Sequence, residues 1–259
     1  MPDALPDVYE REWSPRDYLQ QYYSTPYVPD DSQTVLAFLK EHLTHRRSGY
    51  SRAVEFGCGP TLYTALALIP HVEQLHLADY LPNNLDEVQR WLAGEPKAHD
   101  WGVYVRYILE QEYGRPPTAD EVTAREVELR GKVVGLHQCD IRQPHPLGRP
   151  QVFDLVASFF CIEAVSSDRG EWELFLERLA SMVAPGGSMM LAAVRRCTGY
   201  EVLGRLFPAA RVDETDFLRV LPKLGFDLGE LVVRAVPIAE WAAEGFDSIC
   251  CVWATKRSN

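Results

Sequence analysis

Apolar runs of strand length alternate with segments of helical spacing along most of the chain. Short apolar runs predict β-strands, and apolar residues at intervals of three and four predict helices with one buried face. Strands are expected at residues 52–56, 73–79, 132–140, 153–161, 188–194, 228–236 and 248–256. Helices are expected between strands at residues 61–69, 83–94 and 171–184.

This alternation predicts an α/β fold with a mainly parallel, seven-stranded sheet and helices on both faces, because consecutive parallel strands need helical crossovers. The last two strands have no helical pattern between them and are expected to pair antiparallel. Residues 106–131 interrupt the alternation and are interpreted as a helical excursion, a loop followed by one charged helix.

The beginning of the chain has a different character, rich in aromatic residues and proline. Residues 15–23 and 33–43 show helical spacing, the first with a proline in its first turn. We predict a single domain over residues 1–259, in which residues 1–45 form a helical lid and residues 50–259 form the α/β core.

Composition and charge narrow the class of protein. The net charge of −11 and the lack of a basic stripe disfavour nucleic-acid binding. No run approaches 18 uncharged apolar residues and the first residues lack the apolar segment of a signal peptide, so we expect a cytoplasmic protein without membrane contact. The six cysteines lack metal-site spacing and are interpreted as reduced thiols, and a monomer or weak homodimer is expected.

The stretch EFGCGP at residues 55–60 contains the first candidate site. Gly57 and Gly59 follow a predicted strand and precede a predicted helix, so backbone N–H groups are open to a ligand there. Asp79 ends the next strand, where a carboxylate can accept both hydroxyls of a ribose. The pattern therefore predicts a cofactor that contains a nucleoside.

The spacing of the glycines distinguishes between two possible cofactors, a dinucleotide and S-adenosylmethionine. A dinucleotide favours a third small residue after Gly59, and this chain has Pro60, Thr61 and Leu62 instead. S-adenosylmethionine, which carries an ammonium and a carboxylate in place of phosphates, fits better, and a nicotinamide-dependent oxidoreductase is disfavoured. Asp140 and Ile141, at the end of the third strand, are candidates for the adenine.

Six stretches match a known family in order and spacing: SPRDYLQQYY, EFGCGPTLY, ADYLPNNLDEVQRWLAGEPKAHDW, CDIRQPHPLG, SFFCIEAVSSD and APGG. In these the chain resembles the phenylethanolamine, nicotinamide and indolethylamine (thioether) N-methyltransferases. The resemblance implies a Rossmann-like class I methyltransferase fold that uses S-adenosylmethionine and releases S-adenosylhomocysteine. It assigns cofactor contacts to Tyr18, Tyr23, Gly57, Cys58, Gly59, Thr61, Tyr63, Asp79, Tyr80, Asn84, Asp140, Ile141, Ser158 and Phe159.

The resemblance also implies an acceptor site. Glu163 matches the amine-binding glutamate of the phenylethanolamine branch, and we predict that it orients the acceptor and takes its proton. A lid that excludes water from the site is predicted from the aromatic residues Tyr9, Trp13, Tyr18, Tyr22, Tyr23 and Tyr27, of which Tyr9, Trp13 and Tyr22 are also candidate acceptor contacts. The alternative is a helix that packs Tyr18 and Tyr22 onto the core. Phe160 and Tyr200 are candidate apolar walls.

Arg195 and Arg196 stand where the family has acidic acceptor contacts. Two arginines suit an anion, because a guanidinium pairs bidentately with a carboxylate. They therefore indicate an acceptor that bears a carboxylate, such as an amino acid or an aromatic acid. The alternative is that both arginines face solvent or pair with acidic neighbours.

The resulting prediction is methyl transfer from S-adenosylmethionine to a small molecule, at an amine nitrogen of a carboxylate-bearing acceptor. Transfer to a phenol or carboxylate oxygen, and a cofactor-binding protein without catalysis, remain alternatives. His137 and His145 have no companion ligands at metal-site spacing, so no metal is expected. The excess of arginine over lysine, 21 to 5, is typical of a GC-rich genome and suggests bacterial specialised metabolism.

Overall fold

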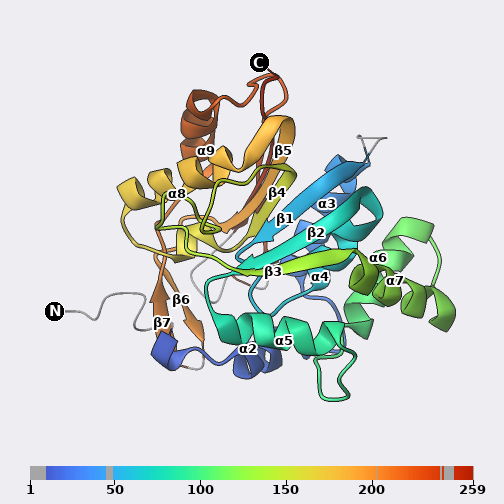
Figure 1. Cartoon of the computed structure of the whole chain (residues 1–259). Coiled ribbons are helices and arrows are strands. Elements are labelled where there is room, and N and C mark those ends of the chain that lie inside the picture. Colours follow the sequence, from blue (N-terminus) through green and yellow to red (C-terminus); the bar gives the residue numbers. More distant parts are fainter. Residues whose placement is uncertain (1–9, 45–48, 203, 240, 242–247, 259) are drawn as a thin grey trace.

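A seven-stranded sheet runs through the centre of the computed structural model (Figure 1). The structure describes residues 10–44, 49–202, 204–239, 241 and 248–258. In spatial order the strands are β3 (Val133–Gln138), β2 (Val72–Asp79), β1 (Tyr50–Phe56), β4 (Phe153–Phe159), β5 (Val183–Val194), β9 (Ser248–Thr255) and β8 (Val232–Pro237).

The predicted mixture of parallel and antiparallel pairing is confirmed. β1 pairs in parallel with β2 on one side and β4 on the other, and β4 pairs in parallel with β5. β9 is antiparallel to both β5 and β8. The chain order reverses between β1 and β4, which makes the carboxyl ends of these two strands the switch point where open α/β sheets bind ligands.

Helices cover both faces of the sheet (Figure 1). One hydrophobic core contains side chains of α3, α4, α5 and α6, and the other contains those of α8 and α9. Neighbouring strand residues alternate between the two cores, as Met189 and Met190 do in β5. The helices are α2 (Pro15–Tyr22), α3 (Asp30–Leu43), α4 (Tyr63–Leu68), α5 (Pro82–Leu92), α6 (Gly102–Tyr113), α7 (Ala119–Lys132), α8 (Arg169–Ser181) and α9 (Glu214–Val220).

The excursion is a pair of helices, whereas the sequence interpretation had one. α6 was missed because valine, tyrosine and isoleucine favour strands on propensity alone. Its residues Tyr104, Val105, Ile108 and Leu109 are nevertheless buried on one helical face. The pair is fixed by Arg125 of α7, which is 6% exposed and donates to the Glu112 carboxylate and the Leu66 carbonyl.

Two further elements differ from the sequence expectation. A hairpin of β6 (Gly199–Val202) and β7 (Arg205–Pro208) follows β5 and was not predicted. β5 begins at Val183, so the Pro-Gly-Gly stretch lies within the strand. At the start of α9, the capping box between Asp213 and Asp216 leaves Asp216 buried beside Arg169.

No helix in the described part of the chain is long and apolar enough to cross a bilayer. Likewise, no three His, Cys, Asp or Glu side chains among the described residues are grouped as they would be around a metal ion. His137 instead lies against His76, with 2.9 Å between His76 Nδ1 and His137 Nε2.

The two glycines of the turn after β1 have different structural roles. Gly57 has φ +71°, and a Cβ atom there would lie 2.0 Å from Cys161 Sγ, just beyond β4. Gly59 has φ +59°, and a Cβ atom there would meet nothing within 4 Å. Gly57 therefore admits a neighbouring side chain of the protein itself, while Gly59 has open space toward the cavity.

We predict that Gly57→Ala lowers the free energy of unfolding by at least about 2 kcal/mol, because it adds a steric clash to an unfavourable backbone conformation. Gly59→Ala is the matched control and should cost only the backbone term of about 1 kcal/mol. Urea denaturation of the ligand-free proteins measures both.

The clash with Cys161 is tested by combining Gly57→Ala with Cys161→Gly, which removes both opposing atoms, the Sγ at 2.0 Å and the Cβ at 2.6 Å. The double variant should regain part of the lost stability. Equal stability of the two glycine variants, or no recovery in the double variant, would show that the approach of Cys161 does not determine the choice of glycine.

Candidate active site

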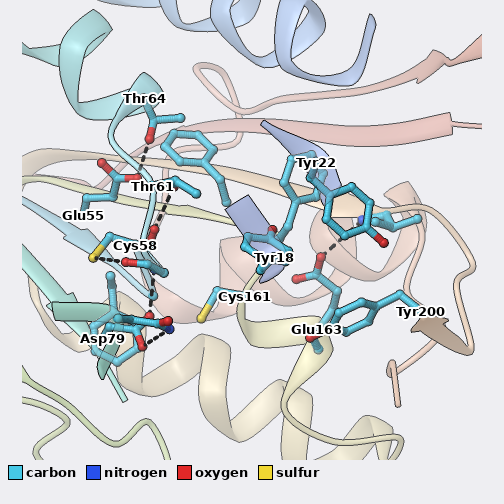
Figure 2. A pocket seen from close by; sticks show the side chains of 18 of the residues that line it. Tyr18, Tyr22, Glu55, Cys58, Thr61, Thr64, Asp79, Cys161, Glu163 and Tyr200 are labelled. Carbon is cyan, nitrogen blue, oxygen red and sulfur yellow. Dashed lines mark hydrogen bonds between the residues drawn. The ribbon is translucent and has the colours of Figure 1, made fainter. Parts of the chain in front are cut away.

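A cavity of about 420 Å³ opens at the carboxyl ends of the parallel strands, between the sheet and α2 (Figure 2). Its walls come from the ends of β1 to β5, the N-terminal segment and the β6–β7 hairpin. Of the residues singled out by sequence, the lining includes Trp13, Tyr18, Tyr22, Tyr23, Gly57, Cys58, Gly59, Thr61, Tyr63, Asp79, Tyr80, Asn84, Asp140, Ile141, Phe159, Phe160, Glu163 and Tyr200.

Three of the sequence candidates within the described part of the chain are not part of this lining. Ser158 is buried within β4, next to the lining residue Phe159, and does not face the cavity. Tyr9 lies outside the described residues. Arg195 and Arg196 lie beyond β5 and are directed elsewhere.

The placement of the two arginines favours the alternative in which they pair with acidic neighbours. Arg195 pairs bidentately with Glu214, at 2.7 and 3.0 Å, and Arg196 pairs with Asp213 at 3.1 Å. Arg196 adopts φ +54°, and its N–H donates to the Val212 carbonyl. The chain thus turns toward the start of α9, and the two guanidinium groups meet the acidic residues there instead of an acceptor.

Asp79 lies in one half of the cavity and accepts three hydrogen bonds. Its Oδ1 accepts from Leu81 N and Asn84 Nδ2, both at 2.9 Å, and its Oδ2 accepts from Gly59 N at 2.8 Å. Burial raises the pKa of this carboxyl, and the three N–H donors partly offset the effect. Oδ2 retains acceptor capacity for a ribose hydroxyl.

Glu55 is a lining residue that sequence reasoning missed. It lies in β1 and is 2% exposed, and the Thr64 hydroxyl donates to its Oε1 (Figure 2). Burial raises the pKa of Glu55 to about 8, although the bond from Thr64 opposes the shift. Its Oε2 has no hydrogen-bond partner among the described residues, so this oxygen is available to a ligand in the cavity.

Asp140 is partnered within its own loop. Arg142 donates to both of its carboxylate oxygens, at 2.8 and 3.0 Å. Burial disfavours the charged form of Asp140, but the hydrogen bonds from Arg142 outweigh it and lower the pKa. The Arg142 guanidinium also lies 4.9 Å from the centre of the Tyr80 ring.

Glu163 occupies the opposite half of the cavity, on the short 3-10 helix Ile162–Ala164 after β4 (Figure 2). Its Oε1 accepts from Val194 N at 3.2 Å, and its Oε2 has no partner among the described residues. Burial raises the pKa of Glu163 to about 7, with the Val194 bond opposing the shift. The group is therefore balanced between its two protonation states near neutral pH.

Aromatic side chains from α2 cover the cavity. The Tyr18 ring lies 5.2 Å from that of Tyr22 and 5.6 Å from that of Tyr23, which also contacts Tyr63. Burial raises the pKa of Tyr18 to about 12, so its hydroxyl stays neutral. These rings line the cavity and pack against core residues, as the packing alternative expected, and exclusion of water by a lid stays a prediction.

The lining has a pronounced charge bias. Asp31, Glu55, Asp79, Asp140 and Glu163 all contribute carboxyl groups. Arg142 is the one basic side chain among the described lining residues, and it is paired with Asp140. Such a cavity favours a ligand with positive charge.

Several other lining residues were not recognised from the sequence. Cys161, Glu55 and Cys197 lie within two residues of recognised positions, and that proximity was a usable signal. Trp241 had no such signal, because tertiary structure alone brings it to the cavity.

The chain matches known proteins over nearly its whole length. The family model of the NNMT/PNMT/TEMT family covers residues 3–257. Indolethylamine N-methyltransferase of Mus musculus is 30% identical over 257 residues, covering 96% of this chain and 94% of the relative. Human nicotinamide N-methyltransferase is 29% identical over 259 residues, covering 98% of this chain and 91% of the relative.

Solved structures with low sequence identity share the fold. The magnesium protoporphyrin IX methyltransferase of Synechocystis aligns with a TM-score of 0.56 at 15% identity, covering 99% of this chain and 98% of the neighbour. The N-methyltransferase NodS of Bradyrhizobium japonicum, with S-adenosylhomocysteine, gives 0.51 at 15% identity, covering 93% and 98%.

The sheet order, the glycine turn, the acidic cavity and these matches lead to one assignment. The fold is that of the class I methyltransferases, as the sequence predicted. The chain belongs to the NNMT/PNMT/TEMT family and is an S-adenosylmethionine-dependent methyltransferase.

Proposed function

We propose that this enzyme methylates the nitrogen of a small amine with an apolar, aromatic body. The observation that carries the proposal is Glu163, a buried carboxylate whose Oε2 has no partner among the described residues, inside the acceptor half of the cavity. Phe160, Tyr200 and Trp241 also line the cavity, and Tyr200 lies beside Glu163 (Figure 2). An amine is the donor that such a carboxylate lacks, and the rings suit its apolar body.

The other half of the cavity fits S-adenosylmethionine on its chemistry. Asp79 is positioned to accept from the ribose, and Gly59 leaves the backbone open beside it. The free Oε2 of Glu55 suits the ammonium of the methionine portion. Tyr80 and Ile141 offer flat and apolar contacts to the adenine. No residue in this arrangement needs a metal ion.

S-adenosylmethionine supplies an electrophilic methyl group on a sulfonium, which is already a good leaving group. The protein has to hold a nitrogen with a free lone pair against that methyl group, and orientation of this kind contributes up to about 7–11 kcal/mol. Glu163 accepts the proton that a bound ammonium must lose. Burial raises the pKa of the carboxyl and lowers that of an ammonium, so the shared cavity narrows the gap between them.

The charge of the cavity argues for an amine without a carboxylate. The arginines that suggested an acid are paired with Glu214 and Asp213, and Arg142 is paired with Asp140. An acceptor carboxylate would therefore enter a cavity lined by carboxyl groups without a free cation among the described lining residues.

Methyl transfer from labelled S-adenosylmethionine to 2-phenylethylamine and to phenylalanine tests this proposal, because the two amines differ by one carboxylate. We expect turnover of 2-phenylethylamine, with kcat/KM at least about tenfold lower for phenylalanine. Preference for phenylalanine would contradict the assigned acceptor class. Cofactor binding without methylation of either amine would contradict it as well.

Glu163→Gln is predicted to lower kcat by about 100-fold, because the amide keeps the size of the side chain but accepts no proton. In the wild type, kcat/KM should rise with pH through about 7 as Glu163 loses its proton. The variant should lose this inflection and keep only the rise in kcat/KM that is caused by loss of the proton from the acceptor's ammonium group. Initial rates between pH 5.5 and 9 measure both effects.

The stability of Glu163→Gln provides the control. The folded protein holds the Glu163 proton to a higher pH than an unfolded chain does, so the stability associated with this group is lost as pH rises through about 7. The variant should therefore melt at the same temperature as the wild type at pH 8, or higher. If Glu163→Gln melts at a lower temperature than the wild type at pH 8, the loss of activity is explained by damage to the fold and not by loss of the proton acceptor.

Arg196→Ala is predicted to leave kcat/KM for 2-phenylethylamine within about twofold of wild type. Its guanidinium pairs with Asp213 outside the cavity, and an exposed pair of this kind contributes about 0–1 kcal/mol to stability. Rates with both probe amines provide the measurement. A tenfold loss confined to phenylalanine would return Arg196 to the acceptor site.

A further inference from the structure

The segment before α2 connects two parts of the cavity through Trp13. Its indole Nε1 donates to Asn84 Oδ1 at 2.8 Å. Asn84 is 3% exposed, and its Nδ2 donates to Asp79 Oδ1 at 2.9 Å. Because the two ends of one buried amide hold Trp13 and Asp79, the orientation of either partner constrains the other.

The opposite side of Trp13 contacts the β6–β7 hairpin. The Trp13 ring meets that of Phe207 edge to face, with centroids 5.7 Å apart and an interplanar angle of 79°. Phe207 is 1% exposed and stacks on Tyr200 at 5.3 Å. Tyr200 lines the acceptor half of the cavity, beside Glu163 (Figure 2).

These contacts form a continuous line from Asp79 through Asn84, Trp13 and Phe207 to Tyr200. We propose that Trp13 is a positioning residue that couples cofactor binding at Asp79 to the arrangement of the acceptor wall at the β6–β7 hairpin. The inference rests on the proposed function, because it takes Asp79 as the cofactor contact. The coupling is reciprocal, so an acceptor that orders Tyr200 also favours the cofactor.

The indole N–H is the specific requirement of this coupling. Phenylalanine at position 13 would keep an aromatic ring against Phe207 but would leave Asn84 Oδ1 without its donor. The ion pair of Arg16 with Glu87 joins the same two segments at 2.8 Å, without contact to Asn84 or Asp79. Arg16→Ala is therefore a matched control for a general weakening of the contact between α2 and α5.

Hydrogen exchange of backbone amides, with and without S-adenosylhomocysteine, tests the coupling without an acceptor. In wild type, the ligand should slow exchange at residues 57–64 directly and at residues 199–208 by at least about fivefold. Trp13→Phe should keep the protection at 57–64 and reduce that at 199–208 to below about twofold. Arg16→Ala should keep both.

The outcomes separate this inference from the proposed function. No protection at 57–64 in wild type would contradict the cofactor site itself. Protection at 57–64 without protection of the hairpin, equal hairpin protection in Trp13→Phe and wild type, or equal loss in Arg16→Ala would each overturn the coupling. Melting temperatures identify a variant that has merely unfolded, and Trp13→Leu repeats the test if Trp13→Phe is unstable.

Discussion

The carboxylate of Asp79 is the interaction on which the arrangement of the cavity depends. It receives N–H groups from the glycine turn after β1, from the start of α5 and from the buried Asn84 side chain. The single carboxyl group of Asp79 thus links two parallel strands and one helix at the switch point of the sheet. Because Asn84 also holds Trp13, the aromatic cover of the cavity depends on the same group.

Two other buried carboxyl groups are unfavourable for folding and suited to binding. Glu55 and Glu163 each have one oxygen with a hydrogen-bond donor and one without, among the described residues. Burial in a low-dielectric interior is unfavourable for the charged form of a carboxyl group. It therefore reduces the stability of the folded protein and raises the pKa of both groups. Both groups would be better satisfied by cationic ligands, so the energetic cost in the free enzyme is concentrated where ligands bind. Folding alone gives no reason for this placement.

The sheet and the cofactor half of the cavity followed from local sequence patterns. The strand end at Asp79, the loop with Asp140 after β3 and the turn at Gly57 are each encoded within a few residues, and the parallel order of the strands then brings them together. The sequence missed α6, whose residues favour strands, and the β6–β7 hairpin, whose strands have four residues each. Its explanation for Gly57 was incomplete, because the Cys161 side chain fills the space that a Cβ would need.

The acceptor half depends on where the chain turns after β5, and sequence does not determine that locally. Val194 and Cys197 face the cavity, while Arg195 and Arg196 between them face away. The turn is fixed by distant backbone groups, since Arg195 N donates to the Ser248 carbonyl and Arg196 N to that of Val212. The acids at the start of α9, which the helix dipole favours there, then receive the guanidinium groups. Charge alone suggested an anion site, but the nearest strong acceptors of these arginines belong to the protein itself, and only the tertiary structure brings those acceptors within reach.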